Sequence, residues 1–153
     1  ALSPTNAFQI IQGLETVTLR MEKHCSNAAK VAEYLTSHDK VSKVIYAGLD
    51  EGEAGVRANK YLKGGHGALC GFELKGGKPS GEKFINNLNM FYHVANIGDA
   101  RSLAIHPATT THSQLSDEDM ESAGVNPSYV RLSIGIEHID DIIEDLKNAL
   151  DAA

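Results

Sequence analysis

The stretch Tyr129-Val130-Arg131-Leu132-Ser133-Ile134-Gly135 decides the fold class of this chain. Apolar residues occupy every second position in it, which is the period of a β-strand with one buried face. Val130, Leu132 and Ile134 therefore share the face expected to lie on the core. Arg131 and Ser133 share the opposite face, which places an arginine on the side of the sheet that looks away from the core.

Further strands and helices are predicted around this strand. The pattern favours strands at residues 41–46, 68–74, 91–95 and 102–106, and helices at residues 4–35, 51–64, 80–88, 116–124 and 139–152. Some strands follow one another without an intervening helix, which favours antiparallel pairing. We therefore expect an α+β fold in one domain over residues 1–153: two layers, a mostly antiparallel sheet with helices packed on one face, and a long N-terminal helix.

The N-terminal helix begins at Ser3-Pro4, a hydroxyl cap followed by proline at the first helical position. Apolar residues then recur at steps of three and four, and His24 fills the one gap in that series. An unbroken helix of about thirty residues would be ~45 Å long, whereas a domain of this size has a radius of gyration of about 15 Å. We expect the helix to bend, with an interruption at Gly13, or to reach beyond this piece of the molecule.

The composition is that of an ordinary globular protein. The 153 residues include 14 basic and 20 acidic side chains, which gives a net charge of −6. That sign argues against nucleic acid or an anionic membrane as the main partner, and no apolar run approaches the ~18 residues of a membrane span. The two cysteines, Cys25 and Cys70, are not closely spaced, so we expect free thiols in a cytoplasmic protein.

Arg131 is the sharpest candidate for a binding residue. It is one of only four arginines, and it stands in a strand otherwise poor in charge. A guanidinium presents a planar fork that matches a carboxylate with two parallel hydrogen bonds. A structural ion pair with a neighbouring carboxylate is the competing interpretation.

A second candidate is the segment Ala95-Asn96-Ile97-Gly98-Asp99-Ala100-Arg101-Ser102-Leu103. Gly98 and Asp99 mark a bend, and bends expose backbone N–H groups that can hold anions. An ordinary turn explains the same pattern.

Other kinds of chemistry find no support in the sequence. His93, His106 and His112 match no established ligand spacing, so no metal site is expected. No serine or cysteine lies in a nucleophile motif, no acid pair emerges, and no lysine has the surroundings of an activated amine. We therefore expect no catalytic residue in this chain.

Several motifs, taken in order, give a resemblance. They are Gly13-Leu14-Glu15-Thr16, Leu19-Arg20-Met21-Glu22-Lys23-His24, Asn96-Ile97-Gly98-Asp99-Ala100-Arg101-Ser102-Leu103, His106-Pro107-Ala108-Thr109-Thr110-Thr111-His112 and Val130-Arg131-Leu132-Ser133-Ile134-Gly135-Ile136-Glu137. With them the chain resembles the C-terminal domain of the Cys/Met-metabolism pyridoxal-phosphate enzymes, most closely the O-acetylhomoserine sulfhydrylase branch. The likeness runs in order over nearly the whole chain.

The resemblance implies a division of roles within a larger enzyme. Enzymes of this family hold pyridoxal phosphate on a lysine of a large preceding domain, which we expect to lie outside this chain, so no cofactor is expected on residues 1–153. The C-terminal domain supplies the clamp for the substrate carboxylate. By motif position Arg131 would be that clamp, with Asn96 and the Ile97 backbone N–H assisting and Thr111 near the same pocket.

The activity implied is replacement of the acetate of O-acetylhomoserine by sulfide or a small thiol, giving homocysteine or methionine. The expected partners are an O-acetylhomoserine-like amino acid, the missing pyridoxal-phosphate domain of the same protein, and further copies in a homo-oligomer. The chain alone is expected to be inactive. The alternatives are a cystathionine γ-synthase or lyase of the same family, an independent module that binds a small carboxylate, and a purely structural or dimerising piece.

Overall fold

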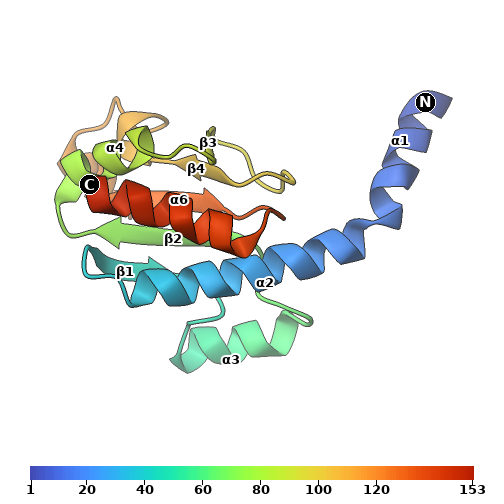
Figure 1. Cartoon of the computed structure of the whole chain (residues 1–153), viewed down its shortest axis with the longest axis horizontal. Helices are drawn as coiled ribbons and strands as arrows, with labels where there is room; N and C mark the ends of the chain where they lie inside the picture. Colours follow the sequence, from blue (N-terminus) through green and yellow to red (C-terminus); the bar gives the residue numbers. More distant parts are fainter.

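The computed structural model describes residues 1–153 and contains one five-stranded sheet (Figure 1). Its strands are β1 (Val41–Ile45), β2 (Leu69–Leu74), β3 (Tyr92–His93), β4 (Leu103–Ile105) and β5 (Tyr129–Ser133). Their spatial order is β1-β2-β5-β4-β3; β3 and β4 run parallel, and every other neighbouring pair is antiparallel. The helices are α1 (Pro4–Glu15), α2 (Val17–Thr36), α3 (Gly52–Tyr61), α4 (Gly77–Asn86), α5 (Asp117–Ser122) and α6 (Ile139–Ala152), with a short 3-10 helix η1 (Pro107–Thr109). The predicted α+β class with a mostly antiparallel sheet is confirmed.

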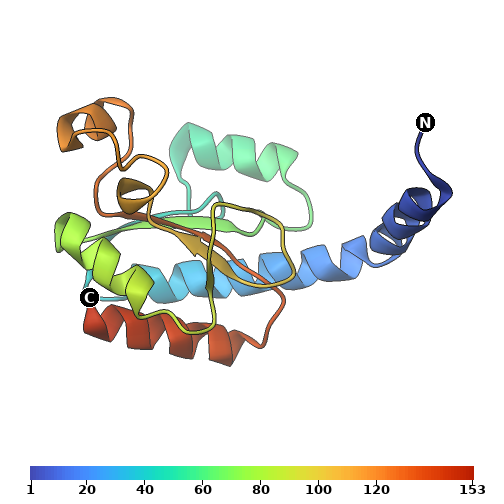
Figure 2. The ribbon, with the colours of Figure 1, turned by 90° about the horizontal axis from the view of Figure 1, so that it is seen from above.

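The main core lies between one face of the sheet and a layer made of α2, α4 and α6 (Figure 2). Val130, Leu132 and Ile134 are fully buried there, as the alternation in β5 predicted. Phe72 of β2 and Phe84 of α4 meet edge to face in the same core, with ring centroids 5.2 Å apart. α3 is outside this layer and lies on the other side of the sheet from α6 (Figure 2).

The N-terminal helix bends and also reaches beyond the body of the molecule (Figure 1). The break falls at Thr16, three residues after the predicted interruption at Gly13. The Arg20 side chain stabilises the bend, because it donates to the Thr16 hydroxyl and, over 2.9 Å, to the Gly13 carbonyl oxygen. α1 itself buries no residue, and Phe8 and Leu14 are largely exposed on it.

The starts of α5 and α4 can be compared with the helix starts predicted from the sequence. The helix predicted at residues 116–124 is α5, which Ser116 caps: its Oγ accepts the Asp119 N–H over 3.1 Å, and Gly124 follows the helix with φ of 79°. The predicted start of α4, at residue 80, is wrong. The helix begins at Gly77, which has φ of 69° and turns the chain directly into the first helical turn, so Ser80 lies inside it.

The two cysteines are free thiols. Cys70 lies in β2 on the core side, and burial raises the pKa of its thiol to about 12, so it stays protonated near neutral pH. Cys25 is half-buried on α2, where it packs against Gly65. None of the helices combines the length and the apolar content that a bilayer crossing requires.

Candidate functional site

Arg131 lies in β5 on the sheet face opposite the α2–α4–α6 layer. Its neighbours across the strands are Gly71 of β2 and Ile105 of β4. The side chain is half-buried and takes part in no ion pair. Its one hydrogen bond runs from Nη2 to the carbonyl oxygen of Asn96, over 3.1 Å. The competing interpretation of Arg131 as half of a structural ion pair is therefore wrong.

Tyr129 forms a wall beside this guanidinium. It precedes Arg131 by two residues and so shares its face, and its ring lies over Gly71, where a Cβ would collide with it. Burial raises the pKa of the Tyr129 phenol above its usual value, while the positive charge of Arg131 acts in the opposite direction. The ring therefore lies over the cross-strand neighbour of Arg131.

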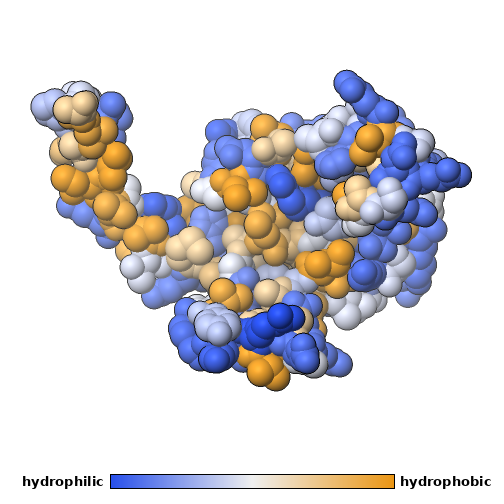
Figure 3. Space-filling model, turned by 180° about the vertical axis from the view of Figure 1, so that it is seen from behind, coloured by the Kyte–Doolittle hydropathy of each residue, from blue (hydrophilic) through white to orange (hydrophobic).

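The surface around Arg131 is open and partly apolar. Ile45 and Leu69 stand on the same outer face of the sheet, opposite Gly71 and Ser133 respectively, and both are exposed. From behind, this side of the molecule shows hydrophobic surface next to polar surface (Figure 3). An arginine on such a face is accessible to a ligand that carries both a charged and an apolar group.

The loop that carries Asn96 is fastened to the end of β5 by several hydrogen bonds. The Gly98 N–H donates to Ser133 Oγ over 3.1 Å. The N–H and the hydroxyl of Ser102 donate to the Glu137 carboxylate over 2.6 and 2.9 Å, and Ser102 Oγ accepts the Gly135 N–H over 2.9 Å. Glu137 thus fixes the loop relative to Arg131. This role was not predicted from the sequence, although Glu137 and Ser102 both lie in the motifs that carry the resemblance.

The predicted clamp residues are only partly brought together. Asn96 contacts Arg131 through its backbone carbonyl, and its side-chain Oδ1 accepts the Ile97 N–H over 2.9 Å. The Ile97 N–H is therefore engaged within the loop and would exchange partners to receive a carboxylate. Thr111 lies elsewhere in the hydrogen-bond network: its exposed hydroxyl is 2.9 Å from His112 Nδ1 and makes no bond to the other three. The binding roles of Arg131, Asn96, Ile97 and Thr111 stay predictions.

A pocket of about 280 Å³ lies next to this loop. It is enclosed by the first turns of α2, the beginning of β2 and the segment Ile97-Gly98, and Ser133 lies in its wall. We call it the α2 pocket. Because Ser133 follows Arg131 by two residues on the same face of β5, the α2 pocket and the guanidinium are neighbours.

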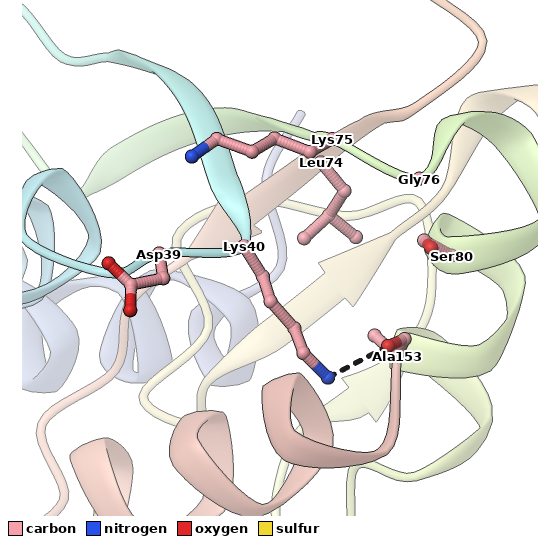
Figure 4. Close-up of a pocket in the computed structure, with 7 residues that line it drawn as sticks. All are labelled: Asp39, Lys40, Leu74, Lys75, Gly76, Ser80 and Ala153. Carbon is pink, nitrogen blue, oxygen red and sulfur yellow. Dashed lines mark hydrogen bonds between the residues drawn. The ribbon is translucent and has the colours of Figure 1, made fainter.

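A smaller hollow of about 220 Å³, near the C-terminus, has a structural explanation (Figure 4). Lys40 Nζ donates there to the carbonyl oxygens of Asp151 and Ala153, over 3.0 and 2.9 Å. A lysine in this position satisfies carbonyl groups that the end of a helix leaves free. Lys75 lines the same hollow, but its ammonium group points away from Lys40 (Figure 4).

His106, one of the histidines considered as a metal ligand, is held by protein groups on both sides. Its Nε2 lies 2.8 Å from the Pro127 carbonyl oxygen, and its Nδ1 lies 3.0 Å from Thr109 Oγ1. Since a carbonyl only accepts, Nε2 carries the hydrogen and Nδ1 accepts from the threonine hydroxyl. Burial is the main cause that lowers the pKa of His106. No three side chains of the usual ligand types gather anywhere in the chain.

A family model described as Cys/Met metabolism PLP-dependent enzyme matches residues 1–151. The chain belongs to this family. The predicted membership of this family is therefore confirmed, and the similar proteins include O-acetylhomoserine sulfhydrylases.

Three relatives give the extent of the likeness. The O-acetyl-L-homoserine sulfhydrylase of Leptospira meyeri is 55% identical over 98% of this chain and 34% of its own length. The homocysteine synthase of Schizosaccharomyces pombe is 48% identical over 99% of the chain and 35% of its length. A crystal structure from Campylobacter jejuni, assigned as an O-acetylhomoserine (thiol)-lyase, matches with a TM-score of 0.87 and 43% identity over 99% of this chain and 36% of that one. The chain spans about a third of the length of the curated relatives that it matches.

Proposed function

We propose that this chain holds the α-carboxylate of an amino-acid substrate through Arg131, as the C-terminal part of a pyridoxal-phosphate-dependent transferase of the O-acetylhomoserine sulfhydrylase type. One observation carries the proposal: Arg131 is half-buried on the open face of the sheet, has no carboxylate partner and is oriented by the Asn96 carbonyl. A guanidinium has five N–H donors, and one hydrogen bond leaves enough of them for both oxygens of a carboxylate. Fixing the carboxylate would orient the reacting end of the amino acid, which is a proximity effect.

The residues of this chain do not fit a cofactor site by themselves. None of the lysines is buried. The two half-buried ones are already engaged, Lys40 with backbone carbonyls and Lys78 with Asp117. A lysine that forms an imine needs a lowered pKa, from burial or from a cationic neighbour. We therefore propose that pyridoxal phosphate is held outside residues 1–153. The Campylobacter jejuni relative, which carries N′-pyridoxyl-lysine-5′-monophosphate at position 205, supports a cofactor lysine within the longer polypeptide.

That this chain forms the C-terminal part of a longer enzyme is a prediction, and the full coding region tests it. Mapping the natural coding region should show a lysine-bearing cofactor domain upstream of residue 1. A coding region that instead continues beyond residue 153 into that domain would contradict the placement, and a frame limited to these residues would favour an independent carboxylate-binding module.

The names of the relatives support the sulfhydrylase branch over a lyase. An L-methionine γ-lyase of Fusobacterium nucleatum is 43% identical to this chain, less than the sulfhydrylase and the homocysteine synthase described above. The complete enzyme should release acetate from O-acetylhomoserine when sulfide or a small thiol is present. Cleavage of methionine or cystathionine as the main reaction would assign it to one of the other branches instead.

Replacing Arg131 with lysine tests the clamp directly. In the complete enzyme we expect Arg131→Lys to raise KM for O-acetylhomoserine about tenfold or more, because a point charge cannot replace the two parallel bonds and the loss of one charged hydrogen bond costs about 1.5–3 kcal/mol. Steady-state kinetics measures this. Arg57→Lys, on the exposed surface of α3, is the matched control and should leave KM unchanged. An Arg131→Lys enzyme with wild-type saturation by substrate would contradict the proposed role.

A further inference from the structure

The α2 pocket contains a buried histidine with one free nitrogen. His24 is only 4% exposed, and its Nδ1 lies 2.6 Å from the carbonyl oxygen of Ile134. A carbonyl only accepts, so Nδ1 carries the hydrogen. Nε2 makes no hydrogen bond in the structure, yet no fully buried polar side-chain atom is left without a partner. Nε2 is therefore an accessible atom, and the pocket that the ring lines is the space from which it is reached.

In the neutral ring, His24 Nε2 is a hydrogen-bond acceptor, whereas the other polar groups that line the α2 pocket are donors. Ser133 Oγ accepts the Gly98 N–H and keeps its own hydrogen for a ligand. Arg20 contributes a positive charge, and its bonds to Thr16 and to the Gly13 carbonyl leave further N–H groups free. The pocket thus offers one acceptor, two kinds of donor and a positive charge.

The remaining wall is mostly apolar. Met21 on α2, Leu69 at the start of β2 and Ile97 in the loop supply much of it. At about 280 Å³ the pocket lies at or below the small end of the usual range for ligand sites, ~300–1,000 Å³. It suits a weakly hydrated ligand of a few heavy atoms with one hydrogen to donate.

We propose that the α2 pocket binds a small thiol, either hydrogen sulfide or a short alkanethiol, whose S–H donates to His24 Nε2. This rests on the proposed function, in which such a thiol is the second substrate. Arg20 and Ser133 could donate to a carboxylate, but a carboxylate has no hydrogen for Nε2, which would stay without a partner; an ammonium group is repelled by Arg20. An alcohol would make the same hydrogen bond but loses more hydration on entering an apolar pocket.

The location of the pocket fits a second substrate. Ile97 forms part of its wall, and the adjacent Asn96 holds Arg131 through its carbonyl. The two binding places therefore share one loop. Two reactants held next to each other in this way gain from proximity.

The test uses the 153-residue chain, kept reduced, in an NMR titration with ethanethiol. We expect a saturable shift of the His24 ring nitrogens and of the Ile97 and Gly98 amides. Ethanol is the matched ligand and should bind at least about fivefold more weakly, since it is better hydrated. Sodium sulfide and propionate are titrated in parallel. Sulfide shows whether a thiol without an alkyl group binds, and propionate shows whether the pocket prefers a carboxylate.

Two variants test the location of binding. Met21 is 44% exposed, so Met21→Phe fills the pocket without entering the core and should weaken ethanethiol binding about tenfold or more, as expected for steric exclusion. Leu19→Phe adds similar bulk on the same helix, at a residue that is 68% exposed and does not line the pocket, and should leave binding unchanged. Unaltered binding in Met21→Phe, absence of a saturable shift in the wild type, or tighter binding of ethanol or propionate would overturn the proposal.

The outcomes for the pocket and for the proposed function are distinguishable. Sulfhydrylase activity of the complete enzyme without thiol binding by this chain would overturn the pocket and leave the proposed function standing. Thiol binding by this chain, with no reaction of O-acetylhomoserine in the complete enzyme, would overturn the proposed function and leave the α2 pocket as a thiol site.

Discussion

At the scale of single residues, His106 couples the stability of the fold to pH. The ring is fully buried, donates to the Pro127 carbonyl and accepts from Thr109. Burial lowers its pKa because the charged ring would lose its hydration. The unfolded chain then binds a proton at this site more readily than the folded chain does. The contribution of His106 is therefore full above the unfolded pKa, about 6.5, and decreases as the pH falls through that value toward the folded pKa.

A glutamine at this position should remove the dependence. His106→Gln keeps an amide donor for the Pro127 carbonyl but does not titrate. In denaturant unfolding between about pH 7.5 and 5, we expect the wild type to lose up to ~1.4 kcal/mol per pH unit through this group and the variant to lose less. Equal slopes in the wild type and in His106→Gln would contradict the assignment.

Residue orientations were predictable where a period fixes them. The alternation of β5 placed Arg131 on the outer face, and the helical spacing placed His24 among buried residues; both placements are confirmed. The bond partners were not predictable, because they depend on how distant segments meet. Ser102 and Glu137 are 35 positions apart, and nothing in their local sequence requires them to pair.

At the scale of elements, α1 contributes nothing to the core and is bonded to α2 only near the bend, where Arg20 donates to the Gly13 carbonyl. It buries no residue and projects from the end of α2 (Figure 1). Helices as short as this are marginal in water without tertiary packing. Its exposed apolar residues, among them Phe8, Ile11 and Leu14, stabilise nothing in this chain.

Deleting residues 1–15 should therefore change the free energy of unfolding by no more than about 0.5 kcal/mol, as is usual for changes away from the core. Leu35→Ala on α2, at a fully buried residue, should cost about 2–5 kcal/mol in the same denaturant experiment. A deletion that destabilises the chain as much as Leu35→Ala does would mean that α1 packs on the body in solution.

Element type was easier to predict than element boundaries. Apolar periodicity together with capping and turn residues gave each α-helix and strand, but the long helix breaks at Thr16 rather than at Gly13, and β3 is only Tyr92–His93. Backbone hydrogen bonding decides both boundaries. Arg20 reaches back to the Gly13 carbonyl and makes the later bend favourable, while β3 is an edge strand paired with β4 alone.

At the scale of the whole molecule, the two faces of the sheet have different roles. One face is closed by α2, α4 and α6 around a cluster of 20 buried apolar residues, so the chain has a core of its own. The other face carries Arg131, and Ile45 and Leu69 on the same face are exposed. Seen from behind, the molecule shows hydrophobic patches beside polar surface (Figure 3). The sequence predicted the layers, but the opening depends on where the loops lie.

This asymmetry predicts how the isolated chain behaves. It should fold cooperatively, because its core is complete, and yet take up no stoichiometric pyridoxal phosphate, because none of its lysines is buried. After incubation with the cofactor and gel filtration, the chain should elute colourless and form no homocysteine from O-acetylhomoserine and sulfide. The complete enzyme, treated in parallel, should retain the cofactor and react. A yellow, active preparation of residues 1–153 would show that one of these lysines binds the cofactor after all, and that the open face needs no second domain to complete it.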